Sequence, residues 1–422
     1  MALYSFGPDE LNLFGTYPFF NIGRVNHFID LQVVTLNGHD CRLPLESIYE
    51  QGCYFNPTNI PRLFIYIARF LRIGADSTKA VGFALGLSSI GLILFIYQRS
   101  LPRLQAVFAA VLVAGCFPYR LAIERGNIDL LVLILLLTSA FFLSLSNSKY
   151  TPHSFLCICG STICASIAVL GKAYPALVFP VIILTILFAG NLHRKEKTYL
   201  LSLITAIFIA SVAVLLPDIS HMTSSSYREI AGGLGYGLLT SPDKDLSTIF
   251  IITSKLAIIG IIASSAVFDK SDFLGSRTSA KDLGSLLLSD SPRQRLIPIT
   301  FLFGSSILLG TYFVFVNGIY RLSVSLALMA IWIAHSLCSE KITSPHRRPH
   351  GTALFTLSLL LITYSGYRPY ISDSNLQHLT QIFIELFLYP LAVGWLISVL
   401  YILSLAITSK AKTPALFKRL TN

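Results

Sequence analysis

Residues 128–145 read IDLLVLILLLTSAFFLSL, an apolar run of eighteen residues that carries one charge, Asp129, next to its start. A helix needs about 17–25 such residues to cross the hydrocarbon core of a bilayer. Ten further stretches have a similar character and are marked off by charged residues: 79–97, 103–118, 154–170, 174–190, 198–216, 248–268, 296–315, 318–338, 351–367 and 383–406. Backbone that faces lipid must satisfy its own hydrogen bonds, so the sequence predicts about eleven transmembrane helices.

The composition of the whole chain leads to the same class. Of its 422 residues, 54% are apolar and only 13% are charged, whereas an average soluble domain has about 25% charged residues. The mean hydropathy is +0.68. We therefore predict an all-α polytopic membrane protein rather than two or three soluble domains. The net charge of +11 does not indicate a nucleic-acid partner, because Lys and Arg also determine membrane topology.

The distribution of Lys and Arg between alternating loops predicts the orientation. Eighteen lie on one side: Arg99, Arg103, Lys149, Arg194, Lys195, Lys197, Lys270, Arg277, Lys281, Arg293, Arg295, Lys341, Arg347, Arg348, Lys410, Lys412, Lys418 and Arg419. Seven lie on the other: Arg120, Arg125, Lys172, Arg228, Lys244, Arg321 and Arg368. The positive-inside rule places the richer side, with the basic tail 407–422, in the cytoplasm. Residues 1–78 are then outside. They precede a transmembrane bundle, 79–406, whose longest loop, 217–247, is outside as well.

The N-terminal segment contains one helix of a different kind. Residues 62–73 read RLFIYIARFLRI, with three Arg on one helical face and apolar side chains on the rest, as in interfacial helices. A short tilted membrane helix is the alternative. Residues 1–30 show neither a membrane span nor a signal peptide. We expect either a truncated start, which is the preferred interpretation, or a tail that is translocated unaided.

Two carboxylates in this external segment are candidate general bases. Asp30 lies between apolar residues, where desolvation or a neighbouring Arg would shift its pKa. A helix-capping or salt-bridged Asp is the alternative. Asp40 lies in a polar Asn-Gly-His stretch that is more typical of a solvated turn.

The next external loop reads YRLAIERGNID from Tyr119 to Asp129. Asn127 is a good N-cap for the following helix, and Asp129 complements its dipole, so both have a structural explanation. Helix capping does not explain Glu124 and Arg125, which are adjacent in the sequence and are both predicted to lie at the outer face. An Arg there offers a planar fork to a phosphate.

Two more cations lie at the same membrane face. Lys172 is in the short turn GKAYP (Gly171–Pro175), and Arg321 ends the segment VNGIYR. Lysines at helix ends commonly extend to the interface, which is the alternative for Lys172. Together with Arg125, these residues are candidates to clamp a lipid phosphate.

Several common sites are not indicated by any motif. The sequence contains no CxxC pair, no HExxH, no P-loop and no GxGxxG. We predict no metal site and no cofactor, although a divalent metal is not excluded by the sequence. Cys41 and Cys53 could pair in an oxidising exterior.

The order of these motifs resembles that of GT-C glycosyltransferases of family 87, which use polyprenyl-phosphate-mannose. The resemblance covers roughly residues 25–190: an external Asp-Leu, NPTNIPR (Asn56–Arg62), E-R-G-N and G-K-x-Y-P. The first membrane helix of the family pattern and the aromatic residue soon after its catalytic Asp are absent from this sequence.

The resemblance implies a GT-C-like fold with external amphipathic helices. It also implies an inverting transferase that moves a hexose such as mannose from a polyprenyl phosphate to a glycan or glycolipid at the outer face. Asp30 takes the role of the base, with Asp40 second, and Arg125, Lys172 and Arg321 that of donor-phosphate ligands. The candidate substrate-binding residues are Asn59, Arg62, Glu124, Asn127 and Tyr174. The expected location is a bacterial inner or plasma membrane.

Two other functions fit a polytopic membrane protein. A polysaccharide polymerase or ligase would use lipid-diphosphate oligosaccharides at the same face. A transporter or lipid flippase would show ionisable residues in the middle of helices and inverted repeats. Lys255 is the clearest charged residue inside a predicted span, and no repeat is evident in the sequence.

Overall fold

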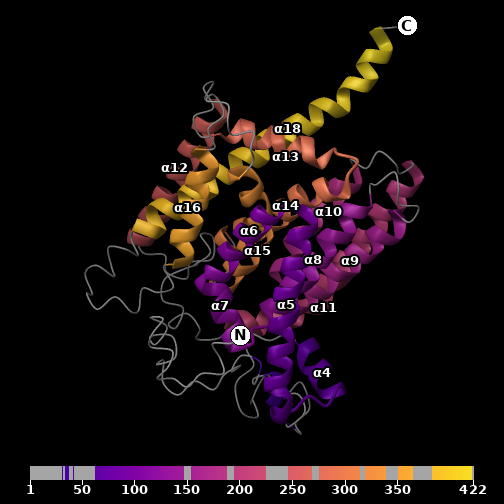
Figure 1. Ribbon diagram of the computed structural model, residues 1–422, viewed down its shortest axis with the longest axis vertical. Coiled ribbons are helices and arrows are strands. Elements are labelled where there is room, and N and C mark those ends of the chain that lie inside the picture. The colour runs from indigo at the N-terminus through magenta and orange to yellow at the C-terminus, as the bar shows by residue number, and fades with distance from the viewer. Residues whose placement is uncertain are drawn as a thin grey trace.

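The structure, a computed structural model, describes most of the chain from residue 62 onward. The described residues are 31, 34–37, 41, 62–146, 154–187, 194–224, 246–268, 275–313, 319–338, 350–364 and 383–420. Nearly all of them are helical, and none of them is in a β-strand (Figure 1). The prediction of an all-α protein is confirmed.

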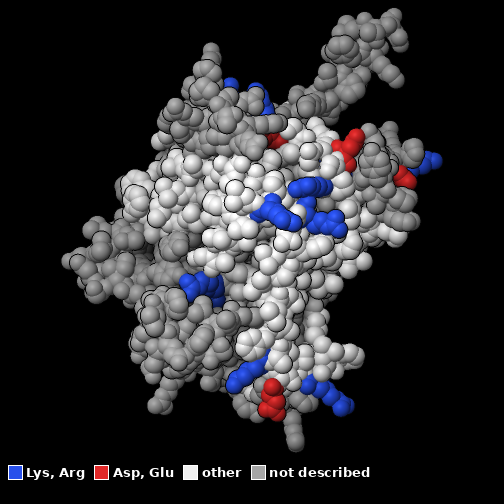
Figure 2. All heavy atoms as spheres, viewed as in Figure 1, with Lys and Arg blue, Asp and Glu red and all other residues white. Residues whose placement is uncertain are grey.

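Eleven apolar helices among the described residues coincide with the eleven predicted stretches. Four of them are long and apolar enough to cross a membrane: α5 (Thr78–Ser100), α9 (Ser154–Gly171), the Lys195–Leu216 part of α11 (Arg194–Ser224) and α14 (Pro292–Phe313). The shorter ones lie in α6 (Arg103–Gly115), α8 (Asp129–Leu145), η5 with α10 (Tyr174–Val178 and Phe179–Leu187), α12 (Leu246–Phe268), α15 (Ile319–Leu337), α16 (His350–Tyr364) and α18 (Tyr389–Leu420). On the face in Figure 2, charged side chains are few and gathered in small groups with broad uncharged surface between them.

The structure differs from the prediction where polar sequence continues a helix or forms a new one. The stretch 103–118 ends at Gly115, and a separate short helix, α7 (Phe117–Arg125), follows. α11 runs to Ser224, inside the range 217–247 predicted as an external loop, and α18 runs through most of the basic tail. A charge ends the apolar part of a helix but leaves its backbone hydrogen bonds intact, so hydropathy locates spans better than helix ends.

α13 (Ser276–Leu287) was not predicted. It lies on the side of the bundle predicted as cytoplasmic, where polar sequence was read as loop. Ala280, Leu283 and Gly284 are buried on one face, whereas Lys281 and Asp282 are exposed on the other. This amphipathic pattern packs α13 against α18 and α14.

Two ends of the bundle can be distinguished by side-chain contacts. The rings of Phe95 and Phe141, near the C-termini of α5 and α8, are 6.0 Å apart, so these helices run in the same direction. α14 begins beside both C-termini: Arg293 Nε donates to the Ser100 carbonyl at 3.4 Å, and the Arg295 guanidinium donates to the Ser144 carbonyl. We call this the basic end. The opposite one, where α8 starts, is the Asp129 end, and α8 alone separates them by ~25 Å.

Cations at the basic end stabilise the helix termini that they contact. The C-terminus of a helix carries partial negative charge, and its last carbonyls have no partner within the helix. Arg295 is almost fully buried, with an exposed fraction of 1%, and its contact with Ser144 places a positive charge at the end of α8. Both arginines belong to the predicted cytoplasmic set.

Small polar residues join α8 to α9, the helix that follows it. The hydroxyls of Ser139 and Ser161 are 2.9 Å apart, and Ser139 also donates to the Ser161 carbonyl. Such residues allow close helix approach in a membrane, where interhelical packing and hydrogen bonds replace the hydrophobic effect. The two helices form an antiparallel pair, which returns the chain to the Asp129 end at Gly171.

Aromatic side chains fill the core between the later helices. The Trp332 ring of α15 lies 4.6 Å from the Phe301 ring of α14 and 5.8 Å from the Trp395 ring of α18. Trp395 also stacks on Phe355 of α16 at 4.5 Å. These contacts hold α14, α15, α16 and α18 together by aromatic pairing.

The short helix α4 (Arg62–Phe70) confirms an amphipathic helix in this region, but it ends three residues before the predicted end at 73. Arg72 lies beyond the helix with a φ of 53°, so it does not share a helical face with Arg69 as predicted. Phe64 and Ile65 of α4 are buried, whereas Phe70 has an exposed fraction of 86%. An exposed apolar face of this kind is typical of a helix that lies in the membrane interface. Cys41, in the same small cluster, is disulfide-bonded, as expected of a segment in an oxidising compartment.

Candidate functional site

The turn between α7 and α8 is built by the residues of E-R-G-N. Gly126 ends α7 with a φ of 61°, in the left-handed region that a residue without a Cβ adopts at little cost. Asn127 then turns its side chain toward the start of α8, where its Oδ1 accepts the Asp129 N–H at 2.9 Å. Asn127 therefore bonds a backbone N–H at the start of the helix as predicted, although α8 begins at Asp129 and the N-cap position itself is Ile128. This bond fixes the Asp129 backbone at the first position of α8.

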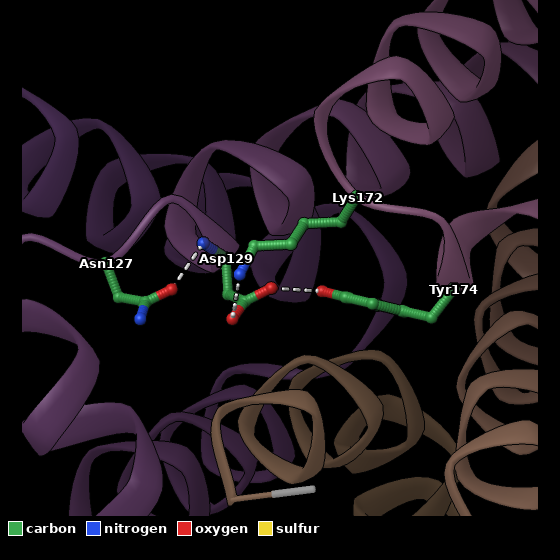
Figure 3. A network of polar contacts seen from close by, with 4 residues as sticks. All are labelled: Asn127, Asp129, Lys172 and Tyr174. Carbon is green, nitrogen blue, oxygen red and sulfur yellow. Dashed lines mark hydrogen bonds and ion pairs between the residues drawn. The ribbon is translucent and has the colours of Figure 1, made fainter. Parts of the chain in front are cut away.

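The turn between α9 and η5 brings Lys172 and Tyr174 to the same place. Tyr174 starts η5 and donates its hydroxyl to Asp129 Oδ1 at 2.7 Å. Lys172, two residues earlier, places its Nζ 3.8 Å from Asp129 Oδ2. Figure 3 shows these side chains pointing toward one another from two separate turns. The two carboxylate oxygens of Asp129 therefore face different partners.

Arg321 joins this group from a third element, the first turn of α15. Its guanidinium carbon lies 5.3 Å from the centre of the Tyr174 ring, a cation–π contact. Its charge interacts with that of Asp129 as well. Asn127, Asp129, Lys172, Tyr174 and Arg321 are hereafter called the Asp129 cluster.

Burial differs sharply within the Asp129 cluster. Asp129 has an exposed fraction of 2% and Tyr174 one of 1%, whereas the Lys172 side chain retains 20%. A buried carboxylate needs compensating charge and hydrogen bonds, which Lys172, Tyr174 and Arg321 supply. The 3.8 Å separation from Asp129 is an ion pair but longer than a hydrogen bond. The Lys172 ammonium therefore makes no hydrogen bond to Asp129 and keeps its N–H donors.

Helix α4 packs beside this cluster. The Phe64 ring lies so close to Gly171 that a Cβ there would be 2.7 Å from two ring carbons. Ile65 belongs to a small apolar cluster with Leu31 and Ile128. Leu31 follows Asp30 in the chain, and Ile128 lies between Asn127 and Asp129. The described part of the N-terminal segment is thus attached directly to the start of α8, where the cluster lies.

The predicted site residues are described to different extents. Asn127, Lys172, Tyr174 and Arg321 are brought together in one place. For Arg62, Glu124 and Arg125 the structure describes the backbone in α4 and α7 but not the side chains. Asp30, Asp40 and Asn59 lie outside the described residues.

Asp129 is the residue whose importance the sequence did not reveal. It was interpreted as a helix-dipole residue, yet it is the centre on which the other members converge. A signal was available: two antiparallel helices of similar length, 17 residues in α8 and 18 in α9, return to the same membrane face. Residues at the start of the first and just after the second then meet.

Metal-ligating residues do not cluster in the described part of the chain. No group of three or more His, Cys, Asp or Glu side chains able to hold an ion occurs among those residues. The Asp129 cluster itself provides two cations, a carboxylate, a phenol and an amide.

Comparisons with known proteins give a distant likeness. No family model matches the chain, and no curated protein matches it either. The crystal structure of ArnT from Cupriavidus metallidurans bound to undecaprenyl phosphate is similar over 93% of this chain and 76% of ArnT, at 11% identity and a TM-score of 0.39. The crystal structure of apo ArnT from the same organism is similar over 93% of this chain and 75% of ArnT, at 9% identity and a TM-score of 0.39. The resemblance to family 87 rests on the sequence motifs.

Proposed function

We propose that this protein is an inverting glycosyltransferase that moves a sugar, a hexose such as mannose, from a polyprenyl phosphate to a glycan or glycolipid acceptor. The observation that carries the proposal is the convergence of Lys172, from the turn after α9, and Arg321, from the first turn of α15, at one end of the bundle. Cations at this position are suited to a phosphate whose lipid tail remains in the bilayer. The motif resemblance to family 87 supports the same chemistry.

Lys172 is the residue best placed to meet the donor phosphate. Its side chain retains an exposed fraction of 20%, and its contact with Asp129 is long. When the sugar is transferred, negative charge grows on the departing phosphate. A cation already held in position by Asp129 stabilises that charge without reorganising in the transition state.

Asp129 positions the cluster in this proposal rather than acting as the base. One of its oxygens accepts the Tyr174 hydroxyl, the other faces Lys172, and its exposed fraction is 2%. An acceptor sugar would not reach it without displacing these partners. Asn127 and Tyr174, expected to bind substrate, contact Asp129 instead, so we assign them to the support of Lys172.

The base is then a different carboxylate, and Asp30 is our first candidate, with Asp40 second. The acceptor hydroxyl oxygen attacks the anomeric carbon while the base takes its proton. The bond between that carbon and the phosphate oxygen breaks, and polyprenyl phosphate leaves with both electrons. General base catalysis of this kind contributes about 10²–10⁴-fold. No nucleotide is consumed, because the sugar–phosphate bond is already activated.

Sugar transfer from a radiolabelled polyprenyl-phosphate sugar, in membranes holding the wild type or Asp30→Asn at matched expression, tests this proposal. We expect transfer by the wild type, and loss of transfer with retained donor binding in the variant. Full activity of the variant would move the base to Asp40 or Glu124. If the wild type transfers none of several donor sugars, the polymerase, ligase or transporter function replaces the proposal.

A further inference from the structure

A second membrane-facing feature lies at the opposite end of the bundle from the Asp129 cluster. α5 and α6 are joined by the two-residue turn Leu101-Pro102 and enclose a groove of about 650 Å³. Ligand pockets typically measure about 300–1,000 Å³. The groove follows α6 from Arg103 to Ala114, which corresponds to about three turns of helix.

The lining of this α5–α6 groove changes along its length. Ala106, Ala110 and Ala114 recur at intervals of four, so they lie on one face of α6 and form a shallow floor. Leu94 and Val111 add apolar walls. Gln98 and Arg103 provide its polar lining at the basic end. An apolar trough that ends in a cation matches a lipid acyl chain with an anionic headgroup.

The charge at the head of the groove is available to a ligand. Arg103 is exposed, and within the described ranges no carboxylate lies at ion-pair distance from it. Arg293 lies in the same region, because its Nε donates to the Ser100 carbonyl at 3.4 Å. A second cation therefore strengthens the positive potential beside Arg103. A ligand with one apolar tail and one negative charge would therefore match both the apolar lining and the cation of the groove.

We propose that the α5–α6 groove binds an anionic phospholipid, with an acyl chain along the alanine face of α6 and the phosphate at Arg103 and Gln98. By the predicted topology, this lipid belongs to the cytoplasmic leaflet. The site is separate from the proposed donor site, which lies at the other end of the bundle. It does not depend on the proposed sugar transfer.

Arg99, near the end of α5 and four residues before Arg103, provides a matched control. Its guanidinium lies 5.6 Å from the centre of the Phe95 ring, and Phe95 contacts Phe141 of α8. Arg99 therefore points toward α8, and it does not line the groove. Arg99→Ala and Arg103→Ala remove the same charge from nearly the same place, but only Arg103→Ala removes it from the groove.

The experiment is native mass spectrometry of the purified full-length protein with an equimolar mixture of dioleoyl phosphatidylglycerol and dioleoyl phosphatidylcholine. We expect the wild type and Arg99→Ala to retain phosphatidylglycerol preferentially. Arg103→Ala should lower the ratio of retained phosphatidylglycerol to phosphatidylcholine about fivefold, the effect of one cation near a membrane surface. Ala110→Phe, which fills the floor of the groove, should reduce retention of both lipids.

Three results would overturn the proposal. The first is an unchanged lipid ratio in Arg103→Ala, and the second is an equal drop in Arg99→Ala, which would mean unspecific attraction to positive charge. The third is displacement of phosphatidylglycerol by polyprenyl phosphate at equimolar concentration, which would assign the groove to a different lipid. Arg103 is exposed, so its replacement leaves the core intact, and circular dichroism would verify the fold of each variant.

Discussion

The Tyr174 hydroxyl donates to Asp129 Oδ1 at 2.7 Å, across 45 positions of sequence. This bond joins the first residue of α8 to the first residue of η5. The bond holds the end of α9 beside the start of α8, and it orients the carboxylate that faces Lys172. The geometry of the proposed phosphate site therefore depends on a hydrogen bond between two buried side chains.

Replacing either partner of this bond should destabilise the protein, and the loss of stability should be larger for Asp129 than for Tyr174. Tyr174→Phe leaves a buried carboxylate oxygen without its donor, which costs about 1–3 kcal/mol. Asp129→Asn removes the negative charge between two cations, and breaking a buried ion pair costs about 3–5 kcal/mol. We expect the loss of stability in Asp129→Asn to lie toward the lower end of this range, because Lys172 is partly exposed. Thermal unfolding in detergent measures both changes, followed by the reaction of buried Cys116 with a thiol dye in a background where the partly exposed Cys157, Cys159, Cys164 and Cys338 are replaced. Equal stability of Asp129→Asn and wild type would contradict the described cluster.

The contact between Gly171 and Phe64 should be sensitive to a single methyl group. A Cβ at position 171 would lie 2.7 Å from two carbons of the ring. Gly171→Ala should displace α4 from the cluster and lower stability by about 1–3 kcal/mol, the usual cost of overpacking. The double variant Gly171→Ala with Phe64→Ala relieves the clash, so it should be less destabilised than the sum of the two single changes. Simple additivity would show that α4 does not rest on Gly171.

The orientation of the bundle can be tested by cysteine labelling. Asp76, at the Asp129 end of α5, and Arg103, at the basic end, are both exposed. In a chain whose five described free cysteines are replaced, we expect an impermeant maleimide to label Asp76→Cys in intact cells. Arg103→Cys should react only after permeabilisation. The reverse pattern would place the Asp129 cluster in the cytoplasm and remove the topological basis of the proposed donor site.

The sequence predicted the membrane-embedded part of the fold well, because hydropathy is a local property. All eleven apolar stretches correspond to apolar helices. The elements that it missed, α7 and α13, are short or amphipathic and rich in polar residues. Their helical form depends on the buried face that tertiary packing gives them, which the sequence alone does not reveal.

The candidate site was predicted in part for a related reason. Lys172 and Arg321 were selected as rim cations, but they were considered separately from Asp129. Their proximity depends on three elements, the start of α8, the α9–η5 turn and the first turn of α15, meeting at one end of the bundle, and residue spacing does not encode that arrangement. The pairing of Asp129 with Tyr174 follows from the similar lengths of α8 and α9. The approach of Arg321 depends on the packing of α15 and required the structure.

The most direct test of the central claim is sugar transfer by Lys172→Met compared with the wild type and with Lys195→Met. Lys195 is an exposed lysine of α11 in the predicted cytoplasmic set, so it controls for loss of charge. With a radiolabelled polyprenyl-phosphate sugar as donor, we expect Lys172→Met to lose about 10²–10³-fold in rate, as for other preorganised electrostatic groups. Lys195→Met should match the wild type. Transfer by Lys172→Met at the wild-type rate would contradict the claim that this cluster holds the donor phosphate.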